Sequence, residues 1–385
     1  MNSELVMEER SPAPDPTTGL RVAFFSDALP ERNGTGAYYH DLLAHLGARV
    51  TDLAMFQPAL HQRSSISIAM PGDRGQRLEA PSLKRIRQRC AELNPDVVVV
   101  VTPGLYGLLG AWEARRQGAT LIAAFHTDFE QLARMYWNPI ARFFANLILR
   151  TANRIICTAS RSVLINNAGL EPDVRHLGAK HVDLIGTPLA PEFLRRPLSP
   201  IAPTLQRVCF AGRLAPEKNV EYIIDAARAL PTLEFVIGGD GPLNETLRAR
   251  AAGLENVRFA GWLDRTSLID LIDDASLLLL PSAFETFGSV ALEAMARGRP
   301  ALVSVTTGIH AWPELRSGLI SLATPQTLVE VLEELMQMTP EDWFARSAAA
   351  RQAAEALNER TVDHWVQLLQ RYSDPQLPSP ADSET

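Results

Sequence analysis

Two glutamates eight residues apart, Glu285 and Glu293, flank a segment with the pattern of a helix start. The segment follows the apolar run Leu277–Leu280 and a short polar loop, so a strand, a loop and a helix are expected in that order. Carboxylates at such a place suit a ligand with hydroxyl groups, such as a sugar or a ribose, whereas a capping Glu285 and a solvated Glu293 form the simpler alternative. The backbone N–H groups of the helix start would bind an anion, and they belong to Phe287, Gly288, Ser289 and Val290.

Two cations lie in a second loop of the same kind. Arg213 and Lys218 follow the apolar run Val208–Phe210 and precede an amphipathic helix that starts at Val220. Two such cations beside a strand end clamp a diphosphate, arginine through its bidentate fork and lysine as a point charge. Each alone is more often a solvated surface charge, but together with the helix start and the carboxylate pair they indicate a nucleotide-diphosphate site.

Apolar runs alternate with helical patterns along the chain, and this alternation predicts the elements that position those side chains. Continuous apolar strands separated by helices predict parallel sheets that are covered on both faces. In such sheets ligands bind beyond the carboxyl ends of the strands. We therefore predict an α/β fold with two doubly wound domains of similar size. The runs are Val22–Phe25, Val97–Val101, Leu121–Phe125 and Ile155–Cys157 in the first half, and Val208–Phe210, Glu234–Ile237, Val257–Phe259, Leu277–Leu280 and Ala301–Val303 in the second.

Prolines divide the chain between these domains. Five of them lie from Pro188 to Pro203, where they are expected to interrupt regular structure, so residues 188–203 are predicted to be a linker. The N-terminal domain is then expected over 20–187 and the C-terminal domain over 204–343, followed by a helical stretch over 344–372. The polar, proline-containing ends, 1–19 and 373–385, are predicted to be disordered.

Composition and charge narrow the class of protein. Apolar residues make up 46% and charged residues 21% of the 385 residues, as in a globular protein, and no apolar run is long enough to span a membrane. The net charge is −7, yet residues 20–185 hold 19 Arg/Lys and 14 Asp/Glu, whereas residues 186–385 hold 17 and 26. This balance argues against a general nucleic-acid binder and permits an anionic partner for the first half. Three dispersed cysteines and an N-terminus without a signal-peptide pattern predict a cytoplasmic protein.

Four motifs in the second half resemble those of the retaining family 4 glycosyltransferases. They run from Arg213–Lys218 through GDGP (Gly239–Pro242) and NVRFAGWL (Asn256–Leu263) to the glutamate pair of Glu285 and Glu293. Each motif alone is weak, but their order and spacing are specific. The resemblance implies a GT-B fold, in which two Rossmann-like domains face each other across a cleft, and it implies that the helices over 344–372 cross back to the first domain.

The same resemblance implies roles for the donor-binding residues. Arg213 and Lys218 would bind the donor diphosphate, Glu293 would accept hydrogen bonds from the ribose hydroxyls, and Glu285 would contact the transferred sugar. Other donor contacts would come from residues at strand ends, with the last two of them near the base: Gly212, Gly239, Asp240, Gly261 and Trp262.

The first half carries a weaker part of the resemblance. FHTDFEQLAR (125–134) resembles a segment of lipid-linked mannosyl- and sulfoquinovosyl-transferases, which implies that His126 faces the donor sugar and that Asp128 lies toward the acceptor. Gly34 and Gly36 precede an expected helix; the family implies that they approach the donor phosphates, although a flexible loop is the simpler interpretation. The candidate catalytic residues are His126, Arg213, Lys218 and Glu285.

Together these features predict a retaining glycosyltransferase that moves a hexose from a UDP- or GDP-linked sugar to a hydroxyl of a lipid or glycan. The sequence contains no Asp-x-Asp triplet, so no metal and no other cofactor is expected, and fixed positive charge would stabilise the leaving group. The loop that corresponds to the donor-sugar loop, Val305–Leu322, matches the family imperfectly. UDP-glucose, UDP-sulfoquinovose and GDP-mannose therefore all stay open.

The sequence also bears on other functions and on the partners of the protein. A nucleotide-sugar 2-epimerase of the same fold stays open, and it would turn over the donor without an acceptor. A dinucleotide oxidoreductase is excluded because no G-x-G-x-x-G follows the first strand of either domain. No nucleic acid is expected as a partner. Peripheral contact with an anionic membrane stays open, because Met135–Arg150 mixes aromatic residues with arginines; an ordinary sheet-covering helix is the simpler interpretation of that stretch.

Overall fold

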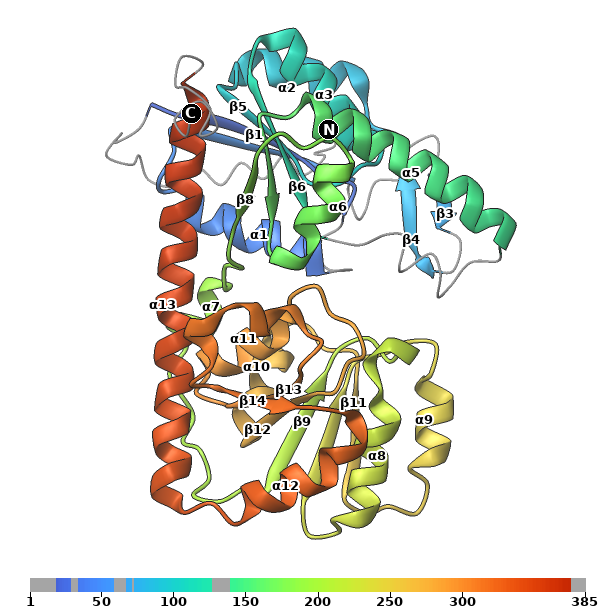
Figure 1. The fold of residues 1–385 in the computed structure, drawn as a ribbon, viewed down its shortest axis with the longest axis vertical. Helices are drawn as coiled ribbons and strands as arrows, with labels where there is room; N and C mark the ends of the chain where they lie inside the picture. The colour runs from blue at the N-terminus through green and yellow to red at the C-terminus, as the bar shows by residue number, and fades with distance from the viewer. Residues whose placement is uncertain (1–18, 29–33, 59–66, 71–72, 127–138, 375–385) are drawn as a thin grey trace, which may run out of the picture. The chain divides into compact units, whose positions relative to one another are not determined.

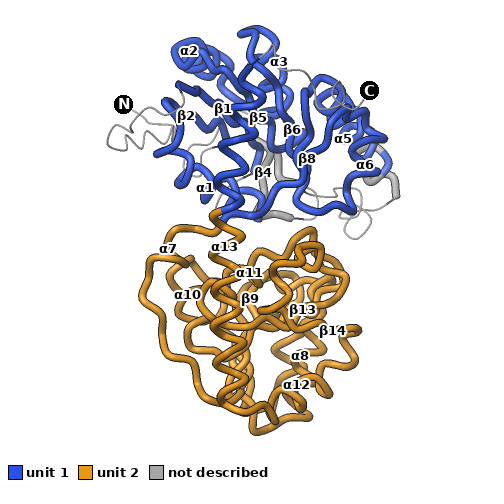
Figure 2. The backbone as a smooth tube through the Cα atoms, turned by 60° about the vertical axis from the view of Figure 1, so that its left-hand side comes forward, with its two compact units in different colours: residues 1–188, 360–385 blue, residues 189–359 orange. Residues whose placement is uncertain are grey.

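The structure is a computed structural model of the chain, and it describes residues 19–28, 34–58, 67–70, 73–126 and 139–374. These residues form two units (Figures 1 and 2), of which unit 1 comprises the chain up to Pro188 and from Arg360 onward. Unit 2 comprises Leu189–Glu359. Each unit holds one six-stranded parallel sheet, so the predicted pair of doubly wound domains is confirmed. The predicted disordered ends lie almost entirely outside the described residues.

The sheet of unit 1 has the strand order β2-β1-β5-β6-β7-β8, so the direction in which strands are added reverses between β1 and β5. All of its strand pairs are parallel. A separate antiparallel pair is formed by β3 (Ser67–Met70) and β4 (Asp73–Glu79). The strands of the sheet are β1 (Arg21–Phe25), β2 (Asp52–Phe56), β5 (Val97–Val100), β6 (Thr120–Phe125), β7 (Ser162–Ile165) and β8 (Val182–Leu184).

Helices cover both faces of this sheet, because successive side chains of a buried strand point to opposite sides. Phe25 packs in one core with α2, α3, α5 and α6, whereas its neighbour Phe24 packs in another core with α1 and the last part of α13. The helices are α1 (Gly34–Leu46), α2 (Leu83–Leu93), α3 (Leu105–Gln117), α5 (Pro139–Ala159) and α6 (Glu171–His176), with a 3-10 turn η1 at Ala168–Leu170.

The sequence-based prediction of one strand is wrong. The run Ile155–Cys157 forms the end of α5, where Ile156 and Cys157 are buried, and the strand of this region is Ser162–Ile165. A short apolar run does not by itself distinguish a strand from the buried face of a helix. Here the run belongs to the apolar face of the longer helical pattern.

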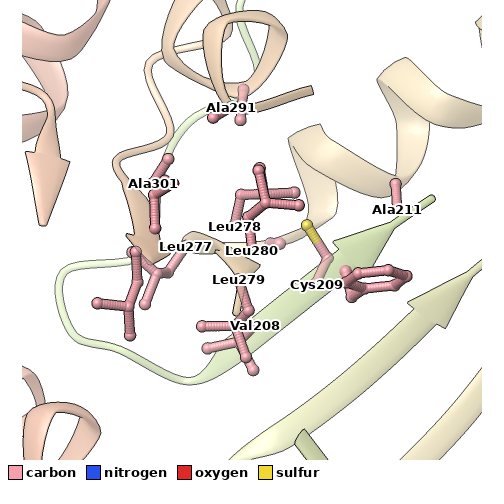
Figure 3. Close-up of a cluster of buried hydrophobic side chains, with 14 of the residues drawn as sticks. Val208, Cys209, Ala211, Leu277, Leu278, Leu279, Leu280, Ala291 and Ala301 are labelled. Atoms are coloured by element: carbon pink, nitrogen blue, oxygen red, sulfur yellow. The ribbon is translucent and has the colours of Figure 1, made fainter. Parts of the chain in front are cut away.

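The sheet of unit 2 has the order β11-β10-β9-β12-β13-β14, with all pairs parallel, and it reverses between β9 and β12. The four leucines of β12 are buried on both faces and lie near Val208 and Cys209 of β9 (Figure 3). The strands are β9 (Arg207–Ala211), β10 (Glu234–Gly238), β11 (Val257–Gly261), β12 (Leu277–Leu280), β13 (Ala301–Ser304) and β14 (Leu319–Leu322). The helices are α7 (Pro191–Arg195), α8 (Val220–Ala229), α9 (Asn244–Arg250), α10 (Arg265–Asp274), α11 (Ser289–Ala296), α12 (Leu328–Met336) and α13 (Pro340–Ser373), with 3-10 turns η2 (Pro216–Lys218), η3 (Gly308–Ala311), η4 (Pro313–Leu315) and η5 (Pro325–Thr327).

The helix α13 contributes to both units. Its early residues, including Trp343 and Leu357, are buried in the core of unit 2. Its later residues, including Trp365 and Tyr372, are buried in the core of unit 1 beside α1. In unit 1 the indole N–H of Trp365 donates to the hydroxyl of Tyr38 at 2.9 Å.

The stretch predicted as a linker, 188–203, is almost wholly part of unit 2. It contains α7, because Pro191 takes the first helical turn, where a proline needs no N–H partner. Beyond α7, the buried Arg297 donates to the carbonyl oxygens of Arg196 and Pro197, both at 2.6 Å. Arg297 is also paired through two hydrogen bonds, of 2.7 and 2.8 Å, with the carboxylate of Asp273. Pro191 therefore starts a helix, and the buried Arg297 holds the backbone that follows this helix in place.

Replacing Arg297 by Met is expected to lower the free energy of unfolding by about 3–5 kcal/mol, because it leaves the buried carboxylate of Asp273 without its partner. The double variant Arg297→Met/Asp273→Leu should lose less of the free energy of unfolding than Arg297→Met alone, because no buried charge is left unpaired. Urea unfolding measures both, and the exposed Arg195→Met serves as a control within about 0.5 kcal/mol of the parent. A single variant as stable as the parent would contradict this assignment.

Candidate donor-binding site

Some of the predicted donor residues of unit 2, among them Lys218 after β9 and Glu285 after β12, lie where its sheet reverses. Others, such as Asp240 and Trp262, follow the neighbouring strands β10 and β11. Ligands of doubly wound sheets bind beyond the carboxyl ends of the strands at this reversal, here after β9 and β12. Two hydrogen bonds hold the loops that follow these strands together. The N–H of Ala283 donates to the carbonyl oxygen of Glu217 at 2.8 Å, and the side-chain amide of Asn219 donates to the carbonyl oxygen of Pro281 at 2.9 Å.

This arrangement brings Lys218 and Glu285 into contact. The ammonium of Lys218 donates to Oε1 of Glu285, and the buried hydroxyl of Ser282 donates to the same oxygen at 3.3 Å. The two paired side chains are only 16% and 18% exposed. An ammonium carries three protons, so Lys218 can keep its bond to Glu285 and also donate to an anion. The pair thus places a positively charged hydrogen-bond donor directly beside a carboxylate that can accept hydrogen bonds.

Four glycines bring the backbone of the neighbouring strand ends together. The N–H of Gly212 donates to the carbonyl oxygen of Gly238 at 3.1 Å, and the N–H of Gly239 donates to that of Gly261 at 2.7 Å. Gly239 has φ +121°, and a Cβ added there would lie 1.8 Å from the carbonyl oxygen of Gly212. Only glycine fits this approach, which leaves main-chain groups rather than side chains at the strand ends.

The helix start that was predicted to bind an anion is formed. Gly288, with φ +92°, precedes α11 and has no side chain that could cap the N–H groups of Ser289 and Val290. Phe287 is buried, and its carbonyl oxygen accepts from the N–H of Ile309 at 2.9 Å, which ties this loop to the one after β13. Glu293 lies half-buried in the second turn of α11.

The remaining predicted residues of unit 2 differ in exposure. Arg213 is half-buried in the loop after β9, and the indole of Trp262 is 68% exposed after β11. Asp240 has a local role, because its Oδ1 accepts from the N–H of Gly241 at 2.8 Å and from the side chain of Asn244 at 3.0 Å. Asp240 therefore stabilises the turn before α9.

In unit 1, His126 lies at the end of β6 in a buried aromatic cluster. Its Nε2 hydrogen-bonds with the hydroxyl of Tyr39 at 2.7 Å, and the ring of Tyr38 lies 4.8 Å from its own. Burial lowers the pKa of His126 to about 4, against a smaller opposing effect of a hydrogen bond with Asn166. The imidazole is therefore neutral at pH 7. Its predicted neighbour in the motif, Asp128, lies outside the described residues.

Gly34 and Gly36 do not precede the helix of unit 1, as the sequence predicts, but lie within its first turn. The anion site that the reversal between β1 and β5 offers in unit 1 is filled by the chain itself. Asp27 accepts from the N–H groups of Tyr106 at 3.0 Å and Gly107 at 3.4 Å, at the start of α3. Burial is the largest influence on the carboxyl of Asp27 and raises its pKa.

Comparison with known proteins identifies the family. The sequence profile described as Glycosyltransferase Family 4 matches residues 32–176, and the one described as Glycosyl transferases group 1 matches residues 196–350. Together the two profiles cover more than three quarters of the chain and match one unit each. The chain belongs to glycosyltransferase family 4. It is thus a glycosyltransferase, as the motifs predict.

Similar proteins include transferases with named donors or products. The GDP-mannose-dependent alpha-(1-6)-phosphatidylinositol dimannoside mannosyltransferase of Mycobacterium tuberculosis is 28% identical over 69% of this chain and 71% of its own length. The sulfoquinovosyl transferase SQD2 of Arabidopsis thaliana is 26% identical over 68% of this chain and 51% of its own length. Neither of these names supports the epimerase alternative.

Solved structures share the fold of this glycosyltransferase. Sucrose-phosphate synthase of Thermosynechococcus elongatus superimposes with a TM-score of 0.70 over 91% of this chain and 98% of its own, at 17% identity. Anabaena HepE in complex with UDP-glucose superimposes with a TM-score of 0.62 over 90% and 99%, at 16% identity. The predicted GT-B fold is therefore confirmed.

Sequence reasoning missed two residues that position the side chains of this site, Asn219 and Ser282. Asn219 adopts φ +54°, a left-handed conformation that asparagine tolerates better than most residues, and its position directly after Lys218 is the signal that was available. Ser282 donates to Glu285 within the same loop, three residues away, and a serine in a polar loop gives no comparable signal by itself. Among the described residues, no group of three or more His, Cys, Asp or Glu side chains is placed to hold a metal ion. No helix of the described residues is both long and apolar enough to cross a bilayer.

The burial of His126 predicts a pH dependence of stability. In the unfolded chain a histidine titrates near pH 6.5, so between about pH 6.5 and 4 the unfolded state binds the extra proton. Stability from this group is complete above pH 6.5 and falls, by about 3 kcal/mol in total, as the pH drops toward 4. The variant His126→Asn should lack this part of the slope in urea unfolding across that range. An identical slope in this variant would refute the assignment; replacing the exposed His176 by Asn is the control.

Proposed function

We propose that this glycosyltransferase moves a hexose from a nucleoside-diphosphate sugar to a hydroxyl of a lipid or glycan, with retention of the anomeric configuration. The observation that carries the proposal is the contact of Lys218 with Glu285 at the reversal of the sheet, beside the uncapped start of α11. A diphosphate needs the positive groups and a sugar needs the carboxylate, and both kinds of group are adjacent here. The names of the mannosyltransferase relative and of the HepE complex with UDP-glucose support a nucleotide-sugar donor.

In this proposal, positive groups stabilise the departing diphosphate. The bond between the anomeric carbon and the phosphate oxygen breaks, and the acceptor oxygen forms a new bond to the same carbon on the same face. The acceptor proton passes to the departing phosphate oxygen. Arg213, Lys218 and the N–H groups at the start of α11 offset the negative charge that develops on the diphosphate, which is usually the largest catalytic contribution.

Glu285 and Glu293 would serve as hydrogen-bond acceptors. Glu285 already accepts from Lys218 and Ser282, so it is held in place to orient the sugar hydroxyls and is not placed as a free nucleophile. Glu293, one to two turns into α11, would accept from the ribose hydroxyls. His126 would act through a neutral ring that is oriented by Tyr39 rather than through a positive charge. Trp262 and Gly261 would lie against the base.

We also propose that the reaction needs no metal ion. The support is the set of fixed cations and main-chain dipoles, which supply the charge that a divalent ion would otherwise provide. Addition of EDTA should therefore leave the transfer rate unchanged, and an EDTA-sensitive rate restored by Mg²⁺ or Mn²⁺ would refute metal independence while leaving donor binding intact.

The nucleotide can be identified by binding alone. A thermal-shift panel of UDP, GDP, UDP-glucose, UDP-sulfoquinovose and GDP-mannose should show one nucleotide series that raises the melting temperature, because a ligand that binds only the folded state stabilises it by mass action. Absence of stabilisation by every compound at millimolar concentration would refute the donor site. Sugar transfer that requires an added acceptor separates a transferase from an epimerase.

Replacing Lys218 or Arg213 by Ala should weaken binding of the identified nucleoside diphosphate by about 10–100-fold, since hydrogen bonds to charged groups contribute about 1.5–3 kcal/mol each. The rate of transfer should fall by at least a factor of ~100. Calorimetric titration and an activity assay measure the two effects, and Lys218→Arg should retain more activity than Lys218→Ala. The exposed Arg258→Ala on β11 is the matched control. Full activity in either alanine variant would show that the diphosphate clamp is misassigned.

A further inference from the structure

Exposed apolar side chains of the chain are concentrated on three helices of unit 1. Twelve large apolar side chains are exposed in the described part of the chain, and seven of them lie on α2, α3 and α5. Four of the seven lie on α5, and they are 53–68% exposed: Phe143, Leu147, Ile148 and Ile155. The three helices cover the same face of the sheet, where α3 contacts both α2 and α5 (Figure 1). A concentration of exposed large apolar side chains on one set of helices indicates a surface that binds a partner.

The same three helices are strongly basic. Their sequences contain nine Arg/Lys and only two Asp/Glu, whereas the whole chain has a net charge of −7. One of the two acids, Glu113, has no exposed surface and is hydrogen-bonded to Arg116 at 2.9 Å. The outward charge of these helices is therefore almost entirely positive. A partner that matches this surface must be both anionic and able to accept apolar side chains.

A tryptophan lies among the cations. Trp112 is 42% exposed, and the guanidinium of Arg87 lies 4.4 Å from the centre of its ring, with that of Arg116 at 5.6 Å. Tryptophan beside arginine is typical of side chains that sit at the boundary between lipid headgroups and acyl chains. Arginines in this geometry would meet lipid phosphates while the indole enters the boundary.

We propose that the outer surface of α2, α3 and α5, here called the α2-α3-α5 surface, docks on an anionic lipid bilayer. Basic side chains near such a bilayer contribute about 1 kcal/mol each, and apolar side chains that reach below the headgroups add to this. A second copy of the chain is a poorer match, because two copies of this surface facing each other would repel. The inference goes beyond the proposed function, and its test needs neither donor nor acceptor.

The test is co-sedimentation of the full chain with vesicles of phosphatidylcholine alone or with about one third phosphatidylglycerol. The parent should bind the anionic vesicles at low salt, bind less at 0.5 M NaCl, and bind the neutral vesicles weakly. The charge variant Lys84→Glu/Arg115→Glu should reduce the partition coefficient by at least ~30-fold, which corresponds to the loss of two basic side chains at about 1 kcal/mol each. The apolar variant Leu147→Gln/Ile148→Gln should also reduce it and should leave the salt dependence in place.

Matched controls come from exposed residues of unit 2. Arg195→Glu/Arg258→Glu changes the net charge of the chain by the same amount as the charge variant, and Leu198→Gln/Phe344→Gln removes two exposed apolar side chains. Both controls should bind vesicles as the parent does, and thermal unfolding with and without the identified nucleotide checks that every variant is folded. The proposal is overturned if the parent does not bind anionic vesicles, or if controls and surface variants lose binding equally. It is also overturned if the surface variants instead convert a parent dimer to a monomer, which would assign the surface to self-association.

Discussion

The contact of Lys218 with Glu285 depends on one feature of the sheet in unit 2, the pairing of β9 directly with β12. The two side chains are 67 residues apart in sequence, and two strand–helix repeats lie between them. Strands are added on one side of β9 first and then on the other. In doubly wound sheets the loops that follow two such strands leave the sheet in opposite directions, and ligands bind between their starts. Both loops carry a charged side chain at this point, Lys218 after β9 and Glu285 after β12.

The two units have the same kind of sheet but use the start of the central helix differently. In unit 1 the carboxylate of Asp27 accepts from the first N–H groups of α3, so a diphosphate there would have to displace a buried anion of the chain itself. In both units a glycine precedes this helix, Gly104 before α3 and Gly288 before α11. Asp27 is the second residue after β1, whereas the second residue after β9 in unit 2 is Arg213, which is a cation. The electrostatics of helix starts thus favour unit 2 as the one that holds a diphosphate.

The sequence was sufficient to predict the two sheets and the segments around Lys218 and Glu285, because buried parallel strands are continuous apolar runs and the loops carry glycines and charges at fixed spacing. It was not sufficient at Ile155–Cys157, where a short apolar run belongs to the buried face of α5, or at Gly34 and Gly36, which lie inside α1. The hydrogen bond from Asn219 to the carbonyl oxygen of Pro281 depends on pairing between strands that are distant in the sequence. The local sequence pattern contains no information on which strands pair. The order and spacing of several motifs along the chain do contain such information when they match those of a known family.

The helix that starts at the proposed anion site is also fixed at its other end. Arg297, the residue that ends α11, is fully buried and bonded to Asp273 and to the carbonyl oxygens that follow α7. A cation at the carboxyl end of a helix interacts favourably with its dipole, and here the hydrogen bonds of the same cation also tie the end of α11 to Asp273 and to the backbone after α7. A site that acts through fixed dipoles gains only if they do not move when charge develops. The buried arginine, eight residues beyond Ser289, is therefore part of the support of the site although it lies far from any ligand contact.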